Sequence, residues 1–246
     1  MPGEKGKQSG RSNLLKNEDW MAVWLGFLII VLVLLGLQVK LPTFKWTTGG
    51  EFSGLVAQMT PAVESLVKSA GEKGEADLLA AATALKTAMG TQDRKAIGDA
   101  AKKLGDASKK AQDAGLKKRA DTIGKEFAGP AAQLPGKVFS AENIGWSLLI
   151  GLGFLVVAAI GNALMGRPVG AFIVGFPLVY VLAWLSQVIA GNATVTYWGL
   201  EYVLWALVIG LFISNVLGVP DWLKEAVRTE YYIKTGLVIL GAGILF

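Results

Sequence analysis

Five polar side chains near the carboxyl end of the sequence are the main candidates for binding a small solute. They are Ser214, Asn215, Glu230, Lys234 and Thr235. Ser214 and Asn215 come just before a glycine and a proline, at 218 and 220, that would interrupt an apolar helix. In transporters, such an interruption exposes polar and backbone groups to the substrate. An ordinary helix end with a capping glycine has the same pattern and stays open as the alternative.

Glu230 and Lys234 are four residues apart, in the order that favours an ion pair on one face of a helix. Thr235 and Gly236 follow directly, where the sequence turns apolar. At the mouth of a membrane helix, this group predicts either a gate for the substrate or a simple anchor at the membrane surface.

Two further polar residues lie at the ends of apolar runs. Glu201 is a carboxylate that would be hydrated or paired near the membrane surface, with a buried proton carrier as the alternative. Asn162 precedes a turn at 166–168 and has the same two interpretations as Ser214: a polar interruption or an ordinary helix end.

The composition excludes several kinds of chemistry. The chain of 246 residues has no cysteine and no histidine, so these residues form no disulfide, no Cys/His zinc site, no haem ligation by histidine and no histidine acid–base pair. We also find no nucleophile with a neighbouring base, no metal-ligand cluster and no phosphate-binding loop. The sequence therefore predicts a protein that is not an enzyme and that binds no metal or cofactor.

Long apolar runs dominate the pattern, and hydrophobic residues make up 52% of the chain. A helix that crosses a bilayer needs about 20 apolar residues. The sequence predicts an all-α polytopic membrane protein with about five transmembrane helices. The first would span 20–39; a signal peptide is less suitable, because no Ala-x-Ala cleavage pattern follows the run. The others lie within 144–246, in runs at 144–165, 171–189 and 197–217, and in a fifth that opens at Thr235 and looks truncated.

Residues 40–143 differ completely, being rich in Ala, Lys, Asp and Gly. Two sets of apolar residues recur at helical spacing, Leu78, Ala82, Leu85 and Met89, and Ile97, Ala101, Leu104, Ala107 and Ala111. We expect a helical insert from near Glu51 to near Phe127, with helix starts at Thr60–Pro61 and at Asp93, and a loop at 129–136. Its lysines alternate with acids, which is typical of a solvated helix face, so no nucleic-acid partner is expected.

The positive-inside rule predicts the orientation of the chain. Basic residues occur in the tail 1–19, in the turn at 166–168 and in 221–229, whereas the loop 190–196 has none. We therefore expect a cytoplasmic amino terminus, an extracytoplasmic insert at 40–143, and an interfacial helix at 221–229 on the cytoplasmic surface of a bacterial inner membrane.

Two segments resemble a known family. VPDWLKEAVRTEYYIKTGLVILGAGILF near the carboxyl end, with NEDWMAVWLGFLIIVLVLL near the amino end, is similar to the sulfate exporter family of bacterial inner-membrane transporters, in its branch with an insert after the first helix. The matching positions are Trp222, Arg228, Thr229, Glu230, Tyr232, Ile233, Lys234, Thr235 and Gly236. The resemblance implies twice this membrane content, arranged as inverted repeats, so that this chain would be the amino-terminal half. It also implies an acidic residue at the position where this chain has Gly243. The glycine here argues against a role of the fifth helix in ion coupling.

Two functions from different classes are compatible with these patterns. The first is a secondary transporter for a small anionic solute, with alternating access of the repeats, whose partners are the lipid bilayer and the carboxy-terminal half of the same protein. The second is a membrane-anchored sensor or interaction protein that binds its partner through the helical insert. A homo-oligomer is compatible with both.

Overall fold

The computed structural model describes residues 16–36 and 39–245, and within these ranges the chain forms helices and no strand. One isolated bridge pairs Trp46 with Asn192. The chain divides into two compact units. The apolar unit takes its described residues from 16–42, 141–187 and 203–245, and the insert unit from 43–140 and 188–202. The prediction of an all-α protein is confirmed.

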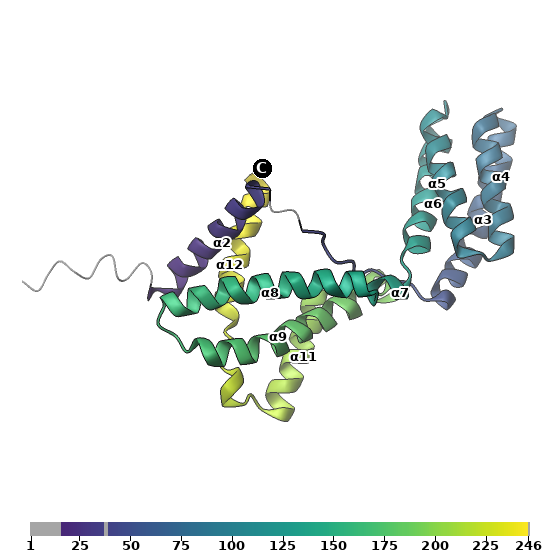
Figure 1. Ribbon diagram of the computed structural model, residues 1–246. Helices are drawn as coiled ribbons and strands as arrows, with labels where there is room; N and C mark the ends of the chain where they lie inside the picture. Colours follow the sequence, from purple (N-terminus) through teal and green to yellow (C-terminus); the bar gives the residue numbers. More distant parts are fainter. Residues whose placement is uncertain (1–15, 37–38, 246) are drawn as a thin grey trace, which may run out of the picture. The chain divides into compact units, whose positions relative to one another are not determined.

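The apolar unit is built from α2, α8, α9, α11 and α12 (Figure 1). Their bounds are Glu18–Leu34 for α2, Ala141–Leu164 for α8, Val169–Ala190 for α9, Tyr202–Phe212 for α11 and Thr229–Leu245 for α12. Two short helices, η1 at Ile213–Leu217 and η2 at Asp221–Leu223, lie between α11 and α12. Only α8 and α9, among the described residues, are long and apolar enough to cross a membrane, so five spanning helices are not confirmed.

Close helix packing in the apolar unit depends on glycines, as expected for helices in lipid. α2 and α12 lie side by side (Figure 1), and a Cβ atom on Gly26 of α2 would lie 2.6 Å from Val238 Cγ1 of α12. On α9, Gly175 faces Ala226 in the same way, at 2.7 Å. These helices share a small core in which Met21, Leu25, Phe172, Ala226 and Tyr231 are buried.

The insert unit is a bundle of α3 (Gly49–Glu72), α4 (Ala76–Thr91), α5 (Arg94–Lys110) and α6 (Ala114–Ala132), followed by the single turn α7 (Pro135–Val138) (Figure 1). Its core is apolar, and its fully buried residues are Val63, Leu66, Ala70, Ala82, Leu85, Ile97, Ala101, Leu104, Ala120 and Phe127. Both predicted stripes lie in or against this core, and Asp93 caps α5 as predicted, accepting a hydrogen bond from the backbone N–H of Lys95.

The predicted helix start at Thr60–Pro61 is wrong. Pro61 lies inside α3, and the Thr60 hydroxyl donates to the Val56 carbonyl one turn earlier. The helix begins earlier because Thr48 and Glu51 form a capping box, in which each side chain accepts from the backbone N–H of the other.

The predicted loop at 129–136 is mostly helical, because α6 continues through Pro130 to Ala132. The Arg94 guanidinium donates to the carbonyls of Thr47, Pro130, Ala131 and Gln133, which satisfies the open end of α6. The loop at 190–196 also contains a short helix, α10 (Ala193–Tyr197), and α11 begins only at Tyr202.

The predicted interfacial helix at 221–229 is also wrong in extent. Within this range the helical residues are the three of η2 and Thr229, which is the first residue of α12, and Asp221 pairs with Lys224. Leu223 and Ala226 are buried, whereas Trp222 is 46% exposed. The first apolar helix begins at Glu18 and ends at Leu34, and the predicted continuation through 37–38 lies outside the described residues.

Candidate functional site

The predicted pair on α12 is present. Lys234 Nζ lies 3.2 Å from Glu230 Oε2, and it also lies 2.5 Å from Asp19 Oδ1 on α2. The Thr235 hydroxyl donates to the carbonyl of Tyr231 and so is engaged within its own helix. The pair therefore joins α2 to α12, a contact that the sequence alone did not predict.

Ser214 and Asn215 lie elsewhere in the apolar unit, on η1, whose five residues form a π-helical turn at the end of α11. Both are exposed, and the Asn215 amide donates to the Leu211 carbonyl one turn earlier. Gly218 follows with φ +74°, a conformation that suits glycine at a helix end. Within the described residues, no hydrogen bond or ion pair joins η1 to Glu230 or Lys234.

A second charged group, which we call the charged node, consists of Glu18, Arg167, Glu225 and Arg228. Glu18 Oε2 lies 2.6 Å from Arg167 Nη2 and 3.9 Å from Arg228 Nη2, while Arg228 Nη1 lies 3.3 Å from Glu225 Oε2. The Arg167 and Glu18 side chains are only 19% and 18% exposed. The node thus ties the start of α2 to the turn between α8 and α9 and to the segment before α12.

Local structure fixes Arg167 in this place. Gly166 adopts φ +73° at the end of α8, and the backbone N–H of Arg167 donates to the Asn162 carbonyl. The Asn162 side chain bonds to the Ala158 carbonyl of its own helix, so Asn162 serves the helix end. Arg167 Nη1 is buried and has no hydrogen-bond partner among the described residues.

Tyr231 packs the start of α12 against α8. Its ring is buried, its hydroxyl lies 3.4 Å from the Ala158 carbonyl, and a Cβ atom on Gly161 would collide with that hydroxyl. Glycine at 161 is therefore what lets α12 approach α8.

The charged node brings two arginines, which can bind anions, next to two glutamates, with which they form ion pairs. A guanidinium binds carboxylate-like and other oxyanions through parallel N–H groups, and Arg167 uses one nitrogen for Glu18 while the other is buried without an acceptor. A buried donor without an acceptor costs about 1–3 kcal/mol, and more when the group is charged, so an acceptor at Nη1 would be favourable. Sequence reasoning missed Glu18 and Arg167 as site residues, although opposite charges at the ends of adjacent apolar runs were visible.

The insert unit contains a cavity of about 510 Å³ between α5, α6 and α7. Its polar rim includes Lys95, Lys102 and Lys137, with Asp93 and Asp99, and its floor is made of small apolar residues. Among the described residues, no three His, Cys, Asp or Glu side chains gather as a metal site.

Comparison with known proteins finds membrane proteins. The chain is 34% identical to the UPF0324 membrane protein of Rhodopirellula baltica over 243 residues, which are 95% of this chain and 41% of that protein. Two UPF0324 membrane proteins of Nitratidesulfovibrio vulgaris are 45% and 42% identical over 111 and 99 residues, covering 43% and 40% of this chain. These alignments span 18% and 17% of those proteins.

No family model and no solved structure matches the chain. The chain spans less than half the length of the relatives, whose names state a membrane protein and no activity. With these relatives and its apolar helices, the chain is an α-helical membrane protein similar to the UPF0324 membrane proteins.

Proposed function

We propose that this chain is the amino-terminal part of a secondary transporter for a small anionic solute in a bacterial inner membrane. Its amino terminus is cytoplasmic, and its partner is a carboxy-terminal half of the same protein that completes the solute site. The match to 41% of the Rhodopirellula baltica protein supports a longer whole. The observation that carries the proposal is the mostly buried Arg167, whose Nη1 has no acceptor among the described residues.

The charged node acts as a gate in this proposal. Its ion pairs join α2, the turn after α8 and the segment before α12, so rearrangement of these elements requires that the pairs break. A solute anion that binds the free Nη1 of Arg167 would draw the guanidinium away from Glu18, and this new charge-assisted interaction would offset part of the cost of breaking the ion pair. The node contains two arginines and two glutamates, so its net charge does not favour anions. Selectivity for anions comes instead from the free N–H donor at Nη1 of Arg167.

The interrupted helix supplies a second element of the site. Ser214 and Asn215 on η1 precede the break at Gly218, and the Glu230–Lys234 pair stands at the start of α12. Broken helices that present polar groups near the substrate are a recurring feature of secondary transporters. Thr235 completes this list of candidate solute-binding residues.

The test uses the protein translated from the complete reading frame, reconstituted in liposomes and supplied with a panel of small inorganic and organic anions. We expect counterflow of at least one anion, which Arg167→Gln abolishes. Arg119→Gln, which changes an exposed insert arginine in the same way, is expected to leave the flux unchanged. Asn215→Ala, Glu230→Gln and Lys234→Gln are measured in the same assay, and normal flux in all three folded variants would remove them from the site.

The alternative function, a membrane-anchored sensor, is favoured by one observation, the cavity in the insert unit with its lysine rim. If the folded protein moves none of the anions, but an anion raises its melting temperature and Lys95→Gln with Lys137→Gln removes that rise, the sensor replaces the transporter.

A further inference from the structure

The segment that follows α9 is bound to the insert by its backbone. The N–H of Trp46 donates to the Gly191 carbonyl at 2.9 Å, and the N–H of Ala193 donates back to the Trp46 carbonyl at 2.9 Å. The indole Nε1 of Trp46 also donates to the Val188 carbonyl at 2.7 Å. Residues 188–193 are therefore fixed to the start of the insert, 142 residues earlier in the sequence.

Glu51 strengthens the same attachment, which we call the clasp: Trp46, Glu51, Asn192 and Thr194 with their backbones. The Glu51 carboxylate accepts from the Asn192 amide at 3.1 Å and from both the backbone N–H and the hydroxyl of Thr194. Burial alone would raise the pKa of Glu51, but the hydrogen bonds from Thr194, Thr48 and Asn192 outweigh it and hold the pKa at about 2. Glu51 is therefore charged at neutral pH.

The clasp continues into a short helix, α10. Asn192 Oδ1 accepts from the N–H groups of Thr194 and Val195, and the N–H of Trp198 donates to the Thr194 carbonyl. The helix α10 thus begins at the clasp and ends at two aromatic residues whose backbone positions are set by the insert unit.

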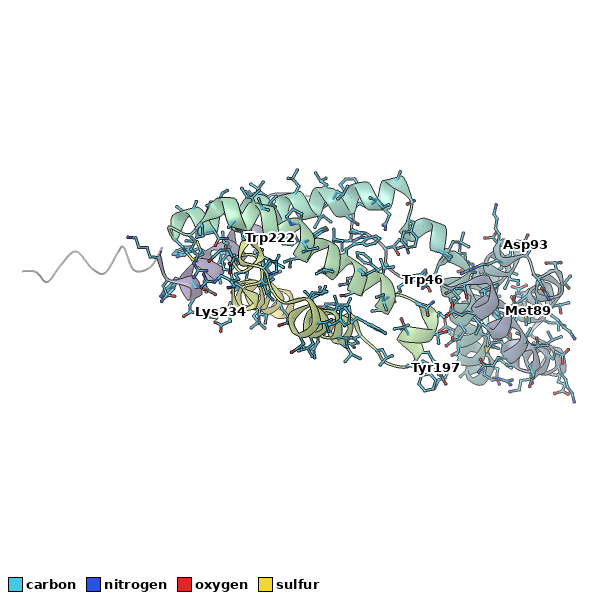
Figure 2. The ribbon with its side chains drawn as sticks, turned by 90° about the horizontal axis from the view of Figure 1, so that it is seen from below. Trp46, Met89, Asp93, Tyr197, Trp222 and Lys234 are labelled. Carbon is cyan, nitrogen blue, oxygen red and sulfur yellow. The ribbon has the colours of Figure 1, made fainter. Side chains whose placement is uncertain are left out.

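These two aromatic residues, Tyr197 and Trp198, are 85% and 70% exposed. Their rings contact each other edge to face, with centroids 5.9 Å apart, so they form an aromatic pair. Figure 2 shows Tyr197 projecting away from the ribbon at the end of α10. No charged residue occurs from 190 to 200, and α11, whose described residues are all apolar and unburied, starts at Tyr202.

We propose that Tyr197 and Trp198 lie in the headgroup interface of the lipid bilayer and, through the clasp, hold the insert unit at the membrane surface. Tyrosine and tryptophan favour this interface because each ring is apolar and carries one polar group. The aromatic pair lies four residues before the start of the apolar helix α11, and between them the exposed carboxylate of Glu201 can stay hydrated at the headgroup level. The absence of charge in 190–200 removes the usual cost of placing this loop at a lipid surface. A transporter and a sensor would both need such an anchor.

Fluorine NMR of the full chain in lipid nanodiscs, with all tryptophans replaced by 5-fluorotryptophan, tests the anchor. The conservative variant Trp198→Phe identifies the Trp198 resonance by its loss. Nanodiscs that contain lipid with a nitroxide near the headgroup should abolish this resonance, whereas a water-soluble gadolinium chelate should leave it visible. Trp46, assigned by Trp46→Phe, lies in the clasp one short helix away and serves as the internal reference, and the nitroxide lipid should broaden its resonance less than that of Trp198.

Loss of the Trp198 resonance with gadolinium, together with its survival in nitroxide lipid, would overturn the proposal, because the pair would then lie in water. Survival under both agents would overturn it too, because the pair would then be covered by protein, such as a second copy of this chain. Circular dichroism that matches the unsubstituted chain confirms that the assigned variants are folded.

Discussion

The two units of this protein bury opposite kinds of side chain in their helices. In the insert unit, α5 buries Ile97, Ala101 and Leu104 and leaves its lysines in solvent. In the apolar unit, α8 leaves large side chains such as Leu148 and Leu152 more than half exposed and buries small or polar ones, Ser147, Gly151, Ala158, Gly161 and Asn162.

The difference follows from the solvent that each unit requires. In water, burial of apolar surface contributes about 25 cal/mol per Å², so the large side chains of the insert gather inside. In lipid, this driving force between helices is absent, and association depends on close backbone approach and on hydrogen bonds and charges. The glycine contacts and the charged node therefore hold the helices of the apolar unit together, as the apolar core does in the insert unit.

Truncation of one phenylalanine in each unit should show the largest contrast. Phe127 in α6 is fully buried, whereas Phe154 in α8 is 45% exposed. Phe127→Ala should destabilise the insert by about 3–5 kcal/mol, because it leaves a cavity in a packed core. Phe154→Ala should cost less than about 1 kcal/mol, since lipid fills the space. Hydrogen exchange of α5, α6 and α8 peptides, measured in nanodiscs, gives both values, and equal losses would contradict the comparison.

A smaller contrast is expected from glycine on α8. A Cβ atom at Gly161 would collide with the Tyr231 hydroxyl and lie 2.8 Å from Leu25 Cδ1. A Cβ atom at Gly153 on the same helix would meet nothing within 4 Å outside its own helix backbone and its chain neighbours. Gly161→Ala should therefore destabilise the apolar unit by about 1–3 kcal/mol through overpacking.

The matched change Gly153→Ala should be neutral or stabilising by up to about 1 kcal/mol, as alanine favours helix. Thermal unfolding in detergent, followed by size-exclusion chromatography, compares the two variants. A lower melting temperature for Gly153→Ala than for Gly161→Ala would show that α8 packs through its other face.

The same contrast explains what the sequence could predict. Leu78, Leu85 and Leu104 were found because a water-exposed helix shows its buried face as a stripe. The apolar runs show no comparable stripe, so the sequence predicted their existence but not which residues face one another. The Glu18–Arg167 contact joins residues 149 apart, and no local pattern encodes it. The capping box at Thr48 and Glu51 was readable, yet Thr60–Pro61 offered a competing start signal.

A substitution in the clasp should have the smallest effect on stability. The clasp holds residues 188–202, which follow most of α9 in the sequence but belong to the insert unit. Glu51→Gln removes the charge that accepts hydrogen bonds from Thr194 and Asn192, and should loosen residues 191–198 by about 1–2 kcal/mol at neutral pH, after allowance for partial exposure. Glu64→Gln, on the same helix, breaks only the exposed pair with Lys86 and should cost no more than about 0.5 kcal/mol.

The pH dependence separates the charge of Glu51 from its role as a helix cap. Its pKa is lowered from 4.5 to about 2 in the folded chain, so its contribution is complete above pH 4.5 and is lost as the pH falls towards 2. In a urea titration followed by the Trp46 fluorine resonance, the clasped fraction of the unsubstituted chain should fall across this window. Glu51→Gln should lose that dependence. If the variant keeps the full pH dependence, another carboxylate holds the segment, and Glu51 acts only as the cap of α3.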